Sequence, residues 1–120
     1  MNDKVNLVEK FAKFSECWCP KIIGDLNDSY VKVAKFQGEF TWHKHDNEDE
    51  LLMVIHGSIT IQFHDRNVVL NEGEFLIVPK GIEHCPKAEN TADVLLLEPK
   101  GTLNTGNVIN EKTVENLDWI

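Results

Sequence analysis

The sequence predicts an all-β fold, a sandwich or barrel of short strands with one short N-terminal helix and an irregular C-terminal tail. From residue 20 onward, runs rich in Val, Ile and Phe alternate with turn-forming stretches such as Asn71-Glu72-Gly73 and Pro79-Lys80-Gly81. Many short strands at this spacing are typical of sandwiches and barrels. Because 120 residues suit one domain with its own hydrophobic core, we expect residues 1–120 to form a single domain with its barrel core at about 21–98.

The N-terminal helix is expected at about residues 3–14, with Asn2 or Asp3 as its cap. Charged residues separate its apolar positions, so the helix would be amphipathic. Four apolar residues recur in this segment at helical spacing: Leu7, Val8, Phe11 and Phe14.

Short strands are expected to follow, each between turn-forming residues. After the last of them, residues 99–120 show weak periodicity and predict an irregular tail whose apolar end packs back on the body. The strands are expected near residues 21–25, 29–37, 39–45, 50–56, 58–64, 67–70, 75–78, 82–88 and 92–98.

The composition excludes several classes of partner. Twenty acidic against twelve basic side chains give a formal charge of -8, which repels phosphate backbones and anionic lipid headgroups. No apolar run reaches the length of about 18 residues that a membrane helix needs. We therefore expect no nucleic-acid partner, no membrane insertion and a cytoplasmic location. Cys17, Cys19 and Cys85, an odd number in so short a chain, are interpreted as free thiols that are buried or half-buried.

The strongest chemical signal is the pair His43 and His45. On a strand, the two-residue period places both imidazoles on one face, where they could chelate a metal ion. Glu50 follows a short acidic turn, and a hairpin could bring its carboxylate beside the pair. His84 would have to reach the other three through the fold. An isolated His-x-His is weak evidence, because surface and core histidines are common.

The surrounding spacing strengthens this interpretation. The two blocks resemble the two sequence motifs of the cupin superfamily, and the closest pattern is that of its small single-domain, mannose-6-phosphate-isomerase-like members. Two departures are visible: the first gap is one residue shorter than usual, and Ala88 stands where Asn often ends the second motif. The first block reads Gly38, four residues, His43-x-His45, four residues, Glu50, six residues, Gly57, and the second reads Gly73, five residues, Pro79-x-Gly81, two residues, His84.

The resemblance implies a double-stranded β-helix, or jelly-roll barrel, that holds one divalent transition metal ion. The ion could be Fe, Mn, Ni, Zn, Co or Cu, because imidazole and carboxylate ligands suit all of them. The implied ligands are His43, His45, Glu50 and His84. His56 and His64 have no support from the motifs and are interpreted as surface residues, and Cys85 as a packing residue.

Four protein ligands leave two positions free on an octahedral ion. Among cupins such an open site implies an enzyme, and we therefore expect a metal-dependent enzyme, of the dioxygenase or isomerase type, that acts on a small organic molecule. A non-catalytic small-molecule binding module, whose metal serves ligand binding or barrel stability, stays open as the alternative. Strand parity with an inward Glu50 nominates residues of the substrate pocket. They are Thr41, Leu52, Val54 and Gln62.

The same parity predicts an apolar outer face. Such a face is too apolar to stay in contact with water, so either the N-terminal helix or a second copy of the chain should cover it. Cupins with this pattern commonly pair through such a sheet, and we expect a homodimer. The outward residues would be Phe40, Trp42, Leu51, Met53 and Ile55.

Overall fold

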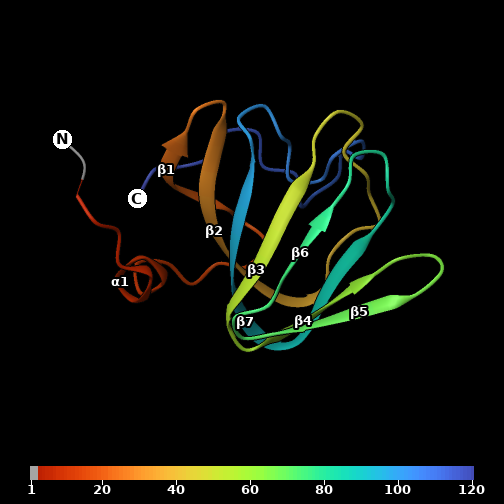
Figure 1. Cartoon of the computed structure of the whole chain (residues 1–120), viewed down its shortest axis with the longest axis horizontal. Coiled ribbons are helices and arrows are strands. Elements are labelled where there is room, and N and C mark those ends of the chain that lie inside the picture. The colour runs from red at the N-terminus through yellow and green to blue at the C-terminus, as the bar shows by residue number, and fades with distance from the viewer. Residues whose placement is uncertain (1–2) are drawn as a thin grey trace.

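The computed structural model describes residues 3–120 and consists mainly of antiparallel strands that curve around a common core (Figure 1). The predicted all-β fold with one short N-terminal helix is confirmed. In chain order, the elements are α1 (Leu7–Phe11), β1 (Lys21–Leu26), β2 (Ser29–Glu39), β3 (Glu50–His56), β4 (Ser58–Gln62), β5 (Asn67–Asn71), β6 (Phe75–Val78) and β7 (Cys85–Pro99).

Strand β7 connects the main sheet to the pair of strands β4 and β5. Its first residues, Cys85–Lys87, pair with β4, and its later residues pair with both β2 and β3. The main sheet therefore has the order β1-β2-β7-β3-β6, while β4 pairs with β5 and β7 off this path. Apolar side chains from both parts meet in one buried core, whose members are Ala34, Phe36, Leu52, Val54, Ile59, Ile61, Leu70, Val78, Ala88, Ala92, Val94 and Leu96.

Two strand predictions were wrong. The strand expected at 39–45 does not form, because β2 ends at Glu39 after a register shift at Gly38, which adopts a positive φ of 77°. In place of the two strands expected at 82–88 and 92–98, a single strand, β7, runs from Cys85 to Pro99. No Gly or Pro occurs in the exposed stretch 89–91, so the chain stays extended where a turn was expected.

The N-terminal helix is shorter than the predicted 3–14. It spans Leu7–Phe11, because the Asn6 side chain accepts a hydrogen bond from a backbone N–H of the first turn and caps the helix there. Asp3 therefore precedes the helix, and the other expected cap, Asn2, lies outside the described residues. Within residues 3–120, no helix is both long and apolar enough to cross a membrane.

The irregular C-terminal tail returns to the start of the barrel, as expected. The Ile120 backbone N–H donates to Ile22 of β1, and the Ile22 N–H donates to Asp118. The indole of Trp119 also lies edge-on to the ring of Tyr30, with 5.6 Å between centroids. The C-terminus accordingly lies beside β1 (Figure 1).

The outer face differs from the prediction at one position. Phe40 is buried and stacks on Trp18, with ring centroids 4.5 Å apart. It turns inward because the segment after β2 is not a regular strand, so strand parity does not apply to it. Trp42 does lie outside, where it stacks on the exposed His64.

Candidate metal centre

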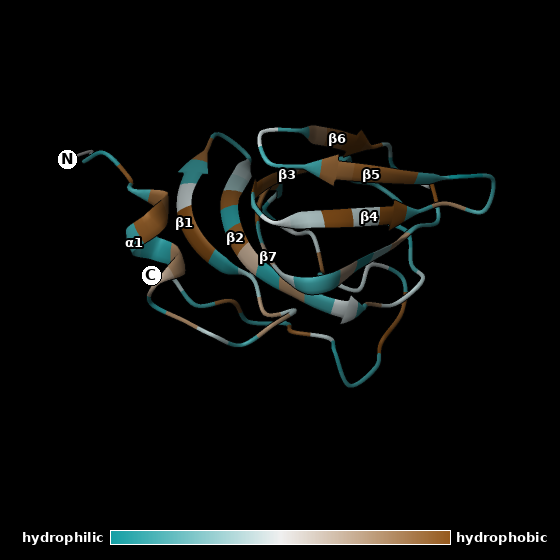
Figure 2. Cartoon of the chain, turned by 90° about the horizontal axis from the view of Figure 1, so that it is seen from below, coloured by the Kyte–Doolittle hydropathy of each residue, from teal (hydrophilic) through white to brown (hydrophobic). Residues whose placement is uncertain are grey.

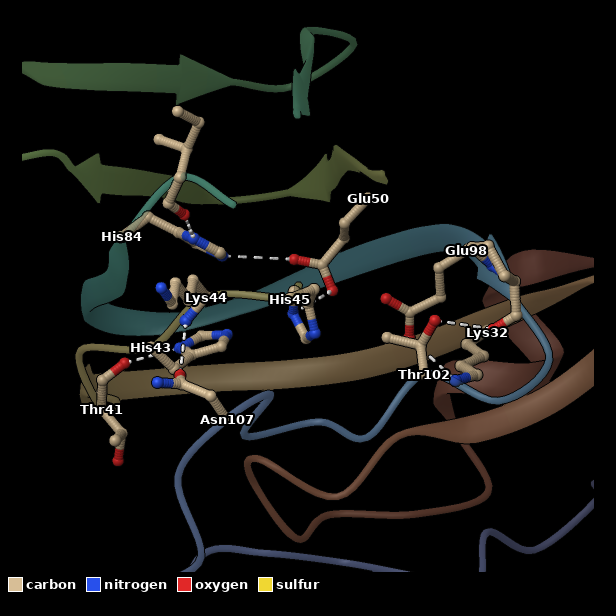
Figure 3. Close-up of polar contacts among 12 residues, drawn as sticks. Lys32, Thr41, His43, Lys44, His45, Glu50, His84, Glu98, Thr102 and Asn107 are labelled. Carbon is tan, nitrogen blue, oxygen red and sulfur yellow. Dashed lines mark hydrogen bonds and ion pairs between the residues drawn. The ribbon is translucent and has the colours of Figure 1, made fainter. Parts of the chain in front are cut away.

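Four side chains from three separate segments meet in one buried cluster (Figure 3). His43 and His45 lie between β2 and β3, Glu50 is the first residue of β3, and His84 immediately precedes β7. One potential ligand atom from each of the four lies within 4.8 Å of the others, and all four residues are buried. The residues that the sequence nominated as metal ligands are thus placed together by the fold.

Backbone hydrogen bonds hold together His43 and His84, the two residues of the cluster that lie farthest apart in the sequence. The His43 N–H donates to the carbonyl of His84 at 3.0 Å, and the His84 N–H donates back to His43 at 2.9 Å. His43 and His84 thus form an isolated antiparallel bridge outside the named strands. It brings the two motifs together although 40 residues separate His43 from His84.

The orientation of two imidazole rings is set by backbone carbonyls. His43 Nδ1 lies 2.7 Å from the Thr41 carbonyl oxygen, and His84 Nδ1 lies 2.9 Å from that of Ile82. A carbonyl can only accept, so each Nδ1 carries the hydrogen and each Nε2 keeps its lone pair. Metal-binding histidines are commonly fixed in this way by a partner on the second ring nitrogen.

Several buried ring nitrogens lack a hydrogen-bond partner. Within residues 3–120, this holds for both ring nitrogens of His45 and for Nε2 of His84. Glu50 comes nearest, at 3.5 Å from His84 Nε2 and 3.7 Å from His45 Nε2. Buried polar atoms are normally paired, so these nitrogens and the facing carboxylate fit a bound metal ion.

The electrostatic environment keeps His43, His45 and Glu50 in the forms that bind metal. Burial, together with the neighbouring His84, lowers the pKa of His43 to about 4, and burial also lowers the pKa of His45. Burial opposes ionisation of Glu50, but the side chains of Glu98, His84 and His45 outweigh it and lower the pKa of this carboxyl. Neutral imidazoles and a carboxylate are the states a metal requires.

Sequence reasoning missed a buried ion pair beside the cluster. Lys32 Nζ on β2 lies 2.8 Å from Glu98 Oε1 on β7, and both side chains are only 2% exposed. Figure 3 shows the Glu98 and Glu50 carboxyl groups pointing toward one another. Burial and the charge of Glu50 raise the pKa of Glu98. Parity was the available signal, since Lys32 is in phase with the inward Ala34 of β2.

A cavity of about 30 Å³ lies next to the cluster, with room for one or two water molecules. Its polar lining comes from His43, Glu50, Glu98 and Asn104. The remaining walls are apolar and come from Trp18, Pro20, Phe36, Phe40, Leu52, Pro86 and Leu96.

The predicted pocket residues occupy different places. Leu52 lines the cavity, whereas Val54 lies within the core. The Thr41 hydroxyl accepts a hydrogen bond from Asn110 of the tail, so its carbonyl, not its hydroxyl, serves the cluster. Gln62 is half-buried outside the cavity and donates to Cys85 and Glu39.

Comparison with known proteins agrees with this geometry. The cupin domain family matches residues 29–99, more than half of the chain. Uncharacterized protein YdbB of Bacillus subtilis (strain 168) is 40% identical over 77 residues, which span 63% of this chain and 62% of that protein. The match therefore covers less than two thirds of the relative's length.

Two solved structures share both the fold and appreciable sequence. A cupin-2 domain containing protein from Shewanella frigidimarina NCIMB 400 is 38% identical, with a TM-score of 0.79 over 80% of this chain and 94% of that one. Protein NMB1881 from Neisseria meningitidis is 30% identical, with a TM-score of 0.75 over 82% of this chain and the whole of that one. The chain belongs to the cupin superfamily.

Proposed function

We propose that this cupin binds one divalent transition metal ion through His43, His45, Glu50 and His84 and acts as a metal-dependent enzyme on a small organic molecule. The observation that carries the proposal is the set of buried ring nitrogens, without hydrogen-bond partners among residues 3–120, that face the Glu50 carboxylate. A structural role alone would leave these groups unsatisfied at a cost of about 1–3 kcal/mol each.

The number of ligands favours catalysis over a closed structural site. Three imidazoles and one carboxylate suit Fe, Mn, Ni, Zn, Co or Cu, and four protein ligands leave two positions of an octahedral ion for exogenous groups. When bound, such an ion supplies Lewis acidity and, for iron, copper or manganese, redox chemistry. The reaction types that we propose are oxygenation and isomerisation.

The residues of this chain would prepare the site for that chemistry. The carbonyls of Thr41 and Ile82 orient two ligand rings. Apolar side chains, with Trp18 stacked on both Phe36 and Phe40, form most of the cavity wall. Polar interactions beside such apolar walls are stronger than in bulk water.

A non-catalytic binding module is the second candidate. The small size of the cavity favours a module whose metal supports the barrel, because about 30 Å³ holds one or two water molecules but no organic molecule unless neighbouring segments move. If those segments do move, the metal would instead serve as part of a ligand clamp. The cytoplasmic location and the absence of a nucleic-acid partner remain predictions under both candidates.

Nitric oxide tests the open metal positions that an oxygenase needs, because it stands in for oxygen at an open iron position. Added without air to Fe(II)-loaded protein, it should give a high-spin iron–nitrosyl EPR signal. A two-oxygen chelator should perturb that signal by taking the adjacent position. A fully iron-loaded sample without a nitrosyl signal would exclude the oxygenase and make the binding module the better account.

A further inference from the structure

The Lys32–Glu98 pair is an unusual feature of the barrel interior. Both residues belong to the inward faces of their strands, where their neighbours in phase, Ala34 and Leu96, are core residues. Burying two charged groups costs several kcal/mol per ion and is repaid only if the remaining polar atoms find partners. The pair therefore calls for a reason beyond stability.

Only one of the two Glu98 carboxyl oxygens takes part in the ion pair with Lys32. Its Oε1 accepts from Lys32 Nζ at 2.8 Å, whereas Oε2 has no hydrogen-bond partner among residues 3–120. Glu98 also lines the cavity that His43 and Glu50 line. An unpaired oxygen of a fully buried carboxyl group thus belongs to the wall of a cavity beside the proposed metal ligands.

The other polar group in the cavity wall outside the proposed ligands is already occupied. The Asn104 amide nitrogen donates to the Lys112 carbonyl oxygen, and its amide oxygen accepts from the Val114 N–H. Among the described residues that line the cavity, Glu98 is therefore left as the side chain that can meet a polar guest without being a metal ligand.

We infer that Glu98, in addition to the metal ion, contacts the bound ligand directly: its free carboxyl oxygen forms a hydrogen bond with a small polar group that occupies the cavity beside the metal. The inference rests on the proposed function. The cavity admits a ligand group of about two non-hydrogen atoms, and Glu98 favours one that carries a hydrogen on oxygen or nitrogen, as in an alcohol, a hydroxylamine or a peroxide. A carboxyl oxygen can accept from such a group or, when protonated, donate to it. Lys32 acts as a positioning residue that holds Glu98 in place.

Hydroxylamine is a suitable probe, because it is neutral at mildly alkaline pH, coordinates metals and can both donate and accept hydrogen bonds. Its affinity is measured by titration of the visible absorption of Co(II)-loaded protein. The test variant is the double substitution Lys32→Met/Glu98→Leu, which leaves neither charge unpaired and should fold. The variant should keep its Co(II) content and bind hydroxylamine at least about tenfold more weakly than wild type.

A matched control lies on the same two strands. Lys35 and Asp93 also form an ion pair between β2 and β7, at 3.0 Å, but Lys35 lies over the rings of Phe11 and Phe14 outside the barrel interior. Lys35→Met/Asp93→Leu should bind hydroxylamine like wild type. Glu98→Gln, which keeps an acceptor and a donor at the same place, should retain most of the wild-type affinity for hydroxylamine.

Each other outcome counts against the inference. Equal hydroxylamine affinity in wild type and Lys32→Met/Glu98→Leu would overturn it while leaving the metal site intact, and so would equal losses in both double variants. Wild-type protein that binds Co(II) but no hydroxylamine would overturn it as well. Wild-type protein that takes up no Co(II) would overturn the proposed function together with the inference.

Discussion

Gly106 of the C-terminal tail lies directly against the backbone of Lys44, so close that a β-carbon on residue 106 would overlap the Lys44 carbonyl oxygen. Lys44 stands between the proposed ligands His43 and His45. Two hydrogen bonds join Asn107 to the backbone of Lys44 beside this contact, at 2.9 and 3.0 Å (Figure 3). The tail is therefore attached to the ligand-bearing segment.

Replacing Gly106 with Ala should loosen this attachment. The glycine also has a positive φ of 56°, so the added methyl group meets both backbone strain and the Lys44 carbonyl oxygen. We expect a loss of about 1–3 kcal/mol in the free energy of unfolding, with faster hydrogen exchange at the Lys44 amide. Gly101→Ala is the control, because nothing lies within 4 Å of a β-carbon there. Equal stability of the two variants would contradict the close contact.

The buried imidazole of His43 predicts how stability depends on pH in the metal-free protein. Its pKa is 6.5 when unperturbed and about 4 in the fold, so between these values the unfolded chain binds more protons than the native one. The free energy of unfolding should therefore fall as the pH decreases through this window, by up to about 3 kcal/mol from this group.

Urea unfolding in the presence of a chelator, at several pH values between 7 and 4, measures this dependence. A His43→Asn variant lacks the titrating group, so its stability should depend less steeply on pH. His64→Asn is the matched control, because His64 is exposed, and it should follow wild type. A wild-type slope no steeper than that of His43→Asn would show that His43 is not held neutral by burial.

The proposed metal ligands could be predicted from sequence because they lie in two short motifs. The two-residue period nominated His43 and His45, and the resemblance to the cupin motifs completed the set with Glu50 and His84. The strand expected at 39–45, which was to form a hairpin with the next strand, is absent. The backbone bridge between His43 and His84 nevertheless brings the same residues together. A pattern of residues can therefore be informative although the secondary structure assigned to it is wrong.

Other features depend on long-range contacts that periodicity does not encode. The inward turn of Phe40 follows from the end of β2 at Glu39, which is set by its pairing with β7. Glu98 becomes important only because β7 places its side chain beside Glu50 and Lys32. The contacts of the tail with Lys44 are likewise invisible in the sequence of the tail itself.

The outer face of β3 and β6 supports the proposed homodimer. Met53 pairs with Phe75 and Leu51 with Ile77, and the two β6 residues are 56% and 51% exposed. The helix packs beside Ile55 in a separate apolar cluster, which leaves β6 uncovered. In Figure 2, β6 is coloured hydrophobic along its length. Contiguous apolar patches of this kind commonly mark interfaces.

Light scattering at micromolar concentration should give the mass of a dimer. Ile77→Lys should shift that mass to the monomer, because a charge cannot be buried unpaired in the interface. Val69→Lys, at a similarly exposed position on β5, should leave the dimer intact. A monomeric wild type, or a dimer that resists Ile77→Lys, would exclude this face as the interface.

The most direct test of the metal site is elemental analysis of protein purified without added metal, compared with His43→Ala, His84→Ala and the control His64→Ala. Wild type and the His64 variant should each carry about one transition metal ion per chain. The other two variants should carry at least about tenfold less under the same conditions, because each loses a ligand from a set of four. Equal metal content in all four proteins, or none in wild type after incubation with each candidate ion, would contradict a metal centre at these residues.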